Sequence, residues 1–125
     1  MSTKKSAKIL KLQCLPNLTT IIAVAIEHYV AVQYPPDSAD CALAAREALL
    51  DVVAKINQTC TTDSHVLLSR RLRTLLKIAI NYYCDQWPDA ENLDAIREQL
   101  LQSLYEQEVD DAILAPLHPD LFHPN

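Results

Sequence analysis

Four basic side chains interrupt an otherwise apolar segment of the chain, residues 67–88. They are Arg70, Arg71, Arg73 and Lys77. Arg70, Arg73 and Lys77 recur at steps of three and four residues, so on a helix they share one face. A basic stripe of this kind can bind the phosphates of a nucleic acid, and such binding weakens steeply with salt because each neutralised phosphate releases counterions.

The charge of the rest of the chain favours a structural interpretation of this stripe. The 125 residues carry a formal net charge of -5, whereas a dedicated nucleic-acid-binding domain is typically basic. From residue 85 to the end, ten acidic side chains oppose one basic side chain, Arg97. We therefore expect the stripe to lie against Glu91, Asp94 and Glu98 of an adjacent antiparallel helix, in surface ion pairs worth about 0–1 kcal/mol each.

Aromatic and apolar side chains supply candidates for a protein interface. Tyr82, Tyr83 and Trp87 fall within six positions, and aromatic clusters are frequent interface hot spots. The alternative is a hydrophobic plug between two helices. Residues 17–33 are apolar on nearly all sides, and such a helix is either buried centrally or shared with a partner. Its candidate contact residues are Ile22, Val24 and Ala31.

The four cysteines, Cys14, Cys41, Cys60 and Cys84, include no C-x-x-C pair, so a zinc site is poorly supported. Cys41 and Cys60 fall on the apolar side of one expected helix, where a free thiol behaves as a small buried hydrophobe. A disulfide or thiol chemistry is the alternative. Reduced cysteines favour a cytoplasmic location.

The remaining titratable side chains form no recognisable catalytic or metal-binding pattern. His28 and His65 read as boundary or partly buried residues, and His118 and His123 lie outside any helical register that would place two metal ligands on one face. The acidic cluster at 106–111 lacks the turn glycine of a calcium loop, so a solvated helix end explains it. We expect no metal, no cofactor and no enzyme activity.

Helices must position all of these side chains. The chain has no glycine and seven prolines, whereas tight hairpin turns usually require glycine and prolines mark helix boundaries. Apolar residues at steps of three and four predict four helices, at about 17–33, 38–58, 63–87 and 89–104. Val109, Ile113 and Leu114 either extend the last helix or form a short fifth one.

The predicted fold class is therefore all-α, a single-domain antiparallel four-helix bundle. The bundle covers residues 16–115, after a basic lead at 1–15 and before an extended Pro-rich tail at 116–125. The first helix follows Pro16, and Asn17 is its expected N-cap. The longest uninterrupted apolar run there, residues 21–26, is too short for a secretory signal core or a membrane span, so we expect no membrane association.

Three short motifs suggest a resemblance. "YPP" after the first expected helix, "AREALLD" in the second and "AINYY" at the end of the third resemble the four-helix lumenal assembly factors of photosystem II, which implies a role in assembling a protein complex. In size and helicity the chain is also similar to the small helical subunits of CRISPR effector complexes, which implies contact with nucleic acid through basic helices.

Together these observations predict an acidic, non-enzymatic interaction module. We expect an adaptor, assembly factor or small subunit of a larger complex that binds another protein or a second copy of itself. The alternative is a small helical subunit of a nucleoprotein complex that contacts phosphates through Arg70, Arg71, Arg73 and Lys77.

Overall fold

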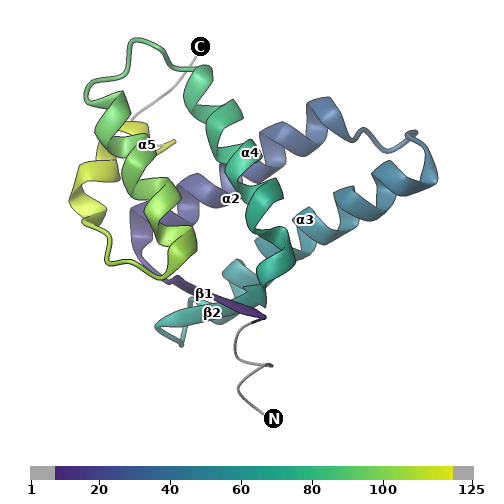
Figure 1. The fold of residues 1–125 in the computed structure, drawn as a ribbon, viewed down its shortest axis with the longest axis horizontal. Helices are drawn as coiled ribbons and strands as arrows, with labels where there is room; N and C mark the ends of the chain where they lie inside the picture. Colours follow the sequence, from purple (N-terminus) through teal and green to yellow (C-terminus); the bar gives the residue numbers. More distant parts are fainter. Residues whose placement is uncertain (1–7, 120–125) are drawn as a thin grey trace.

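A computed structural model describes residues 8–119 (Figure 1). The chain is mostly helical, as expected, but it also contains a two-stranded sheet. In chain order the elements are β1 (Ile9–Gln13), α2 (Pro16–Gln33), α3 (Asp40–Thr59), β2 (His65–Ser69), the 3₁₀ helix η1 (Arg70–Leu72), α4 (Arg73–Asp85), α5 (Leu93–Gln102), and the 3₁₀ helices η2 (Ser103–Tyr105) and η3 (Asp111–Leu117).

Helix α2 is the centre of the core. Its buried residues follow the predicted apolar stripe, from Leu18 through Ile26 to Tyr29, and it packs against α3, α4 and η3. Val32 continues the stripe in sequence but is 58% exposed, because the ends of α2 and α3 project away from the other helices as a hairpin (Figure 1). The first helix is therefore confirmed, and only its last turn escapes burial.

The N-terminus of α2 is capped by a side chain from the other end of the chain. The N-cap position is Leu15, which has no acceptor in its side chain. Instead the Asp111 carboxylate accepts hydrogen bonds from the backbone N–H groups of Asn17 (3.0 Å) and Leu18 (2.8 Å). The expectation that Asn17 caps this helix is wrong, since its side-chain amide donates to the Asp111 carbonyl oxygen (3.0 Å).

The two strands lie in segments that the sequence analysis assigned to a basic lead and to the third helix. β1 and β2 are antiparallel, with Ile9 opposite Ser69 and Gln13 opposite His65. Both strands alternate along their length, and the four side chains that point into the core are Leu10, Leu12, Val66 and Leu68. The all-α assignment is therefore wrong for these two segments. Every second side chain in them is buried, and this alternation is typical of an extended strand.

The third helix is shorter than predicted and the last one is interrupted. α4 begins only at Arg73, after β2 and η1, and packs against α2 and α5. The short fifth helix exists as η3, which continues through Pro116 to Leu117. An antiparallel four-helix bundle is not confirmed. Of the extended tail, residues 116–117 are helical, while residues 120–125, including His123, lie outside the described residues, as do residues 1–7.

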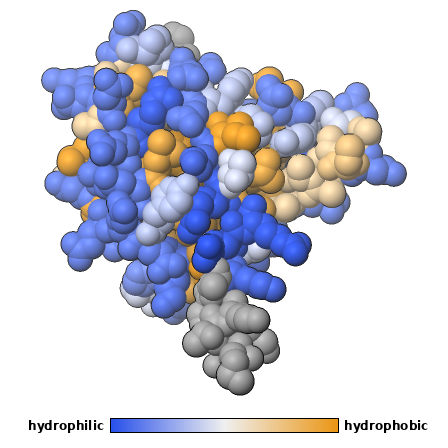
Figure 2. All heavy atoms as spheres, in the orientation of Figure 1, coloured by the Kyte–Doolittle hydropathy of each residue, from blue (hydrophilic) through white to orange (hydrophobic). Residues whose placement is uncertain are grey.

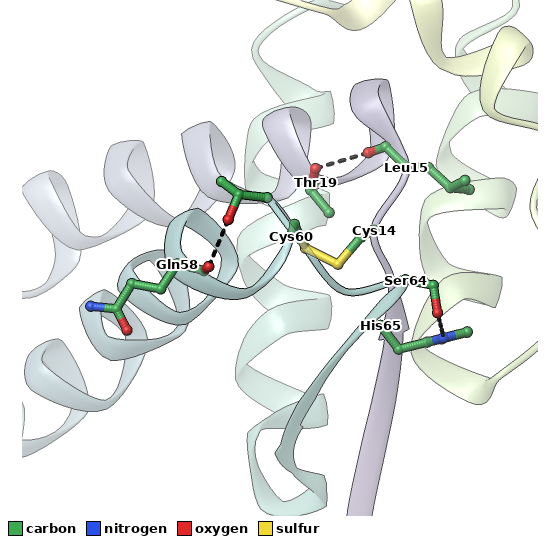
Figure 3. The surroundings of a disulfide bond; sticks show 8 residues. Cys14, Leu15, Thr19, Gln58, Cys60, Ser64 and His65 are labelled. Carbon is green, nitrogen blue, oxygen red and sulfur yellow. Dashed lines mark hydrogen bonds between the residues drawn. A yellow bond between two sulfur atoms is a disulfide. The ribbon is translucent and has the colours of Figure 1, made fainter.

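A disulfide joins Cys14, at the end of β1, to Cys60, which caps the C-terminus of α3 (Figure 3). Next to it, the Cys14 N–H donates to the Ser64 carbonyl oxygen (2.8 Å), which extends the ladder between the two strands. The expectation of a buried free thiol at Cys60 is wrong. It is also wrong for Cys41, which is free but exposed, whereas Cys84 is free and buried.

Within residues 8–119, none of the helices combines the length and apolar character that a bilayer-crossing helix needs.

Candidate interaction surface

The predicted basic stripe divides into two parts with different environments. Arg73 and Lys77 are half-buried and face the aromatic ring of Tyr105. The Arg73 guanidinium lies 4.3 Å from the ring centroid and its Nε–H donates to the Leu104 carbonyl oxygen (2.8 Å). Lys77 Nζ lies 5.6 Å from the same centroid and donates to the Tyr105 hydroxyl (3.1 Å). These two cations therefore stabilise the packing of α4 against η2.

The carboxylates expected to pair with the stripe are not its partners. Arg97 of α5 donates instead to the carboxylate of Asp85 (2.9 Å) and to the side-chain oxygen of Asn81 (2.7 Å), both on α4. The hydrogen bond to Asp85 raises the pKa of Arg97. The structural interpretation of Arg73 and Lys77 is supported, but through an aromatic ring and a carbonyl group. Within α3, Asp51 and Lys55 form an exposed ion pair (3.1 Å).

Arg70 and Arg71 lie at the other end of the stripe and are exposed. Together with Lys8 and Ser69 they line an open cleft of about 540 Å³, which we call the basic cleft. The sheet builds it, since the Arg70 N–H donates to the Lys8 carbonyl oxygen (2.9 Å) and so brings the two basic residues together. Ser69 then accepts from the Arg71 N–H (3.3 Å) and begins η1.

A second opening follows the outer side of β2. We call it the β2 groove; its volume is about 810 Å³, and it is lined by Lys11, Lys55, Thr59, Asp63, Ser64, His65, Val66 and Leu67. Leu67 is 54% exposed on the solvent-facing side of the sheet, directly opposite Lys11 on β1. Strongly hydrophilic side chains gather around the sheet in the lower part of Figure 2, beside the grey residues.

The Ser64 and His65 side chains at this groove hydrogen-bond to each other, with 3.0 Å between Oγ and Nδ1 (Figure 3). Both residues are exposed. Among residues 8–119, the hydrogen bond to Ser64 is the one side-chain hydrogen bond seen at this imidazole. Among the described residues, no three His, Cys, Asp or Glu side chains lie close enough together to hold a metal ion.

The aromatic cluster forms the hydrophobic plug. The Tyr83 ring is buried and makes edge contacts with His28 (5.6 Å between centroids) and Trp87 (6.3 Å), and its hydroxyl donates to the Leu117 carbonyl oxygen (3.3 Å). Burial raises the pKa of this hydroxyl. Tyr82 and Trp87 are half-buried, and both pack against the core. Tyr83 is therefore not an interface residue in this structure, because it closes the core.

The candidate contacts on the first helix differ in the same way. Ile22 is fully buried, so it is core and not interface. Val24 is half-buried and lines a cleft of about 410 Å³ between α2 and α3. Ala31 is exposed on the hairpin that α2 forms with α3, a region where apolar side chains reach the surface in Figure 2. Only Val24 and Ala31 remain available for contact.

The acidic cluster contains structural groups as well as solvated ones. Asp111 caps α2, and Asp110 accepts from the Ala112 N–H (3.1 Å) at the start of η3. Glu106 and Glu108 are exposed. The expectation of a solvated helix end therefore holds for the two glutamates and is wrong for Asp111.

Sequence reasoning missed the β2 groove because it assigned residues 65–69 to a helix. A signal was present. In "HVLLS" and in "KILKLQ", buried residues alternate with exposed ones, which is typical of a half-buried strand. β1 and β2 lie more than 50 positions apart in the sequence, so no tight hairpin turn joins them. The lack of glycine therefore did not exclude this sheet.

No family model matches this chain, and the comparisons with curated proteins and with solved structures give no match either.

Proposed function

We propose that this protein is a non-enzymatic interaction module, an adaptor, assembly factor or small subunit of a larger complex, and that it binds its partner through the exposed side of the sheet. The observation that supports this proposal most is Leu67. This leucine is about half exposed in a strand whose other apolar side chains are buried. Lys11 of β1 lies directly opposite it, and Arg70 and Arg71 of η1 follow the end of the strand.

Two physical arguments support this surface over others. Covering a leucine fully contributes about 1.5–3 kcal/mol, so completing the burial of Leu67 gives a useful central contact. Basic residues on a chain of net charge -5 make the surface electrostatically distinct from its surroundings, which favours one orientation of an approaching partner. The half-buried Val24, between α2 and α3, and the exposed Ala31, on the hairpin, lack such a cluster of basic residues and serve better for self-association.

The second candidate is the small subunit of a nucleoprotein complex. The basic cleft favours it, because Lys8, Arg70 and Arg71 converge there and could contact consecutive phosphates. Arg73 and Lys77 do not belong to this surface, since Tyr105 occupies them. A nucleic acid would then bind at the sheet and not along α4.

The compartment is part of the proposal. The expected cytoplasmic location depended on reduced cysteines, and the Cys14–Cys60 disulfide removes that argument. We propose an oxidising compartment instead, because disulfides persist there and are rare in the cytosol.

The test compares two exposed apolar residues on different surfaces. Leu67→Asp places a charge in the sheet surface, and Val32→Asp is the matched control, since Val32 is 58% exposed at the end of α2. We expect wild type and Val32→Asp to co-purify with the same proteins, and Leu67→Asp to lose them. Equal recovery by all three would contradict the proposal.

Size-exclusion chromatography with light scattering, with and without mixed nucleic acid, tests the second candidate. A shift with nucleic acid that disappears at high salt and in an Arg70→Glu/Arg71→Glu variant supports the nucleoprotein subunit.

A further inference from the structure

We propose that the outer edge of β2 binds an extended acidic peptide as a third strand of the sheet. This inference rests on the proposed function and specifies both its surface and the chemistry of its partner.

The backbone of β2 presents its unused hydrogen-bonding groups outward. The Arg70 N–H donates to Lys8 O, and the Cys14 N–H donates to Ser64 O. In an antiparallel ladder, hydrogen-bonded pairs alternate with non-hydrogen-bonded pairs. Given the register, the even-numbered residues of β2 therefore bond to β1. The N–H and C=O groups of His65, Leu67 and Ser69 point away from β1.

The two edges of the sheet differ in the room beside them. β1 lies against η2, and β2 lies against α3. The cleft beside η2, which Lys11, Gln13 and His65 line, measures only about 120 Å³. The β2 groove is about 810 Å³, which is within the range of binding sites in proteins. An added strand lies about 4.8 Å from its neighbour. The outer edge of β2 is therefore the one that can accept a strand.

The charged residues along the β2 groove and the basic cleft indicate which kind of peptide would bind there. Lys11 faces the groove beside Leu67, and the basic cleft with Arg70 and Arg71 continues from the end of the strand. Asp63 lies at the opposite end of the groove. A peptide with acidic side chains near the Ser69 end and an apolar side chain against Leu67 matches this pattern.

A second copy of this chain fits this edge less well. In an antiparallel pair of β2 strands centred on Leu67, Asp63 of each copy would lie near Arg71 of the other, so the two ends of the pair would be complementary in charge. The strand itself (His65–Ser69) has no acidic side chain that could meet Lys11 in the groove. The occupant that matches these charges is thus an acidic segment of another protein.

Fluorescence anisotropy with a short, end-blocked peptide in which valine and glutamate alternate tests the proposal directly. The control peptide has the same sequence with N-methyl groups on alternate residues, so its charge is kept and its strand hydrogen bonds are lost. We expect the unmodified peptide to bind, and the N-methylated peptide to bind roughly 100-fold more weakly, since about two hydrogen bonds at roughly tenfold each are removed. Equal binding of both peptides overturns the proposal.

A pair of proline variants tests the edge from the side of the protein. Leu67→Pro removes an outward N–H without breaking the ladder, and Ile9→Pro is the matched change on the outer edge of β1. We expect Leu67→Pro to weaken peptide binding roughly tenfold and Ile9→Pro to leave it unchanged. The peptide comparison uses wild-type protein, so it decides the question even where a proline variant fails to fold.

Two further outcomes separate this inference from its premise. If Leu67→Asp loses its protein partners but wild type binds both peptides equally, the interaction module stands and strand addition is refuted. The other outcome is a single-stranded oligonucleotide that binds wild type and Leu67→Pro alike but does not bind Arg70→Glu/Arg71→Glu. If the acidic peptide also fails to bind, the surface is a nucleic-acid site and strand addition is again refuted.

Discussion

Replacing both cysteines of the disulfide by serine should destabilise the protein substantially. The bond joins residues 46 positions apart, and the loop-entropy relation for a loop of this length gives about 4 kcal/mol at 25 °C. The Cys14 N–H bond to Ser64 O involves only the backbone and can persist in the Cys14→Ser/Cys60→Ser variant. The loss therefore arises mainly from the greater freedom of the unfolded chain.

Urea unfolding measures this effect. With a slope of about 2 kcal/mol per molar urea, the midpoint of the variant should lie roughly 2 M below that of wild type. Reductant should lower the wild-type midpoint by a similar amount and leave the variant unchanged. Cys41→Ser, which removes an exposed free thiol, is the matched control and should unfold like wild type.

Two results would refute this reasoning. One is an unfolding midpoint of wild type that does not respond to reductant. The other is a non-reducing peptide map in which Cys14 and Cys60 are not found in one cross-linked fragment, since the assigned bond would then not form.

Three other changes probe the ends of helices and the core. Asp111→Ala removes the acceptor for two N–H groups at the start of α2 and should lower the free energy of unfolding by about 1–2 kcal/mol in urea titrations. Burial raises the pKa of the Cys84 thiol from 9.0 to about 11, so the protonated thiol is favoured in the folded state. Stability should therefore fall as pH rises from 9 to about 11, and the fall should be smaller in Cys84→Ala when unfolding is measured across this range. Glu106 has a left-handed backbone (φ 58°), so Glu106→Gly should raise the thermal midpoint by relieving about 1 kcal/mol, whereas Glu106→Ala should not.

Helix positions could be predicted because apolar periodicity is a local signal. Ile96, Leu100 and Leu104 recur at steps of four within the helix predicted at 89–104, and all three are buried. Helix α2 begins within one residue of its predicted start. The sheet could not be predicted by the same means. Val66 and Leu68 are followed by Leu72 and Leu75, and this run fits a helical stripe as well as a strand that ends in a helix.

The partners of the candidate site residues depend on tertiary contacts that no local pattern encodes. Cysteine pairing cannot be deduced from spacing, so Cys14–Cys60 was one option among several. Likewise, the spacing of Arg73 and Lys77 predicts that they share one face of a helix, but it does not predict which side chain packs against that face. Tyr105 packs there because η2 follows α5 directly and brings this tyrosine against α4.

The Asp111 cap also constrains the order in which the chain can fold as it leaves the ribosome. Helix α2 is complete in sequence by residue 33, yet the carboxylate that satisfies its first amide groups is 94 positions beyond Asn17. The central helix thus emerges with its N-terminal amides unpaired by the protein and frayed, while most of the remaining chain is synthesised. A domain that folds as one cooperative unit commonly does so only once nearly all of its sequence is available. Here Asp111, at the start of η3, supplies the cap that completes the N-terminus of α2.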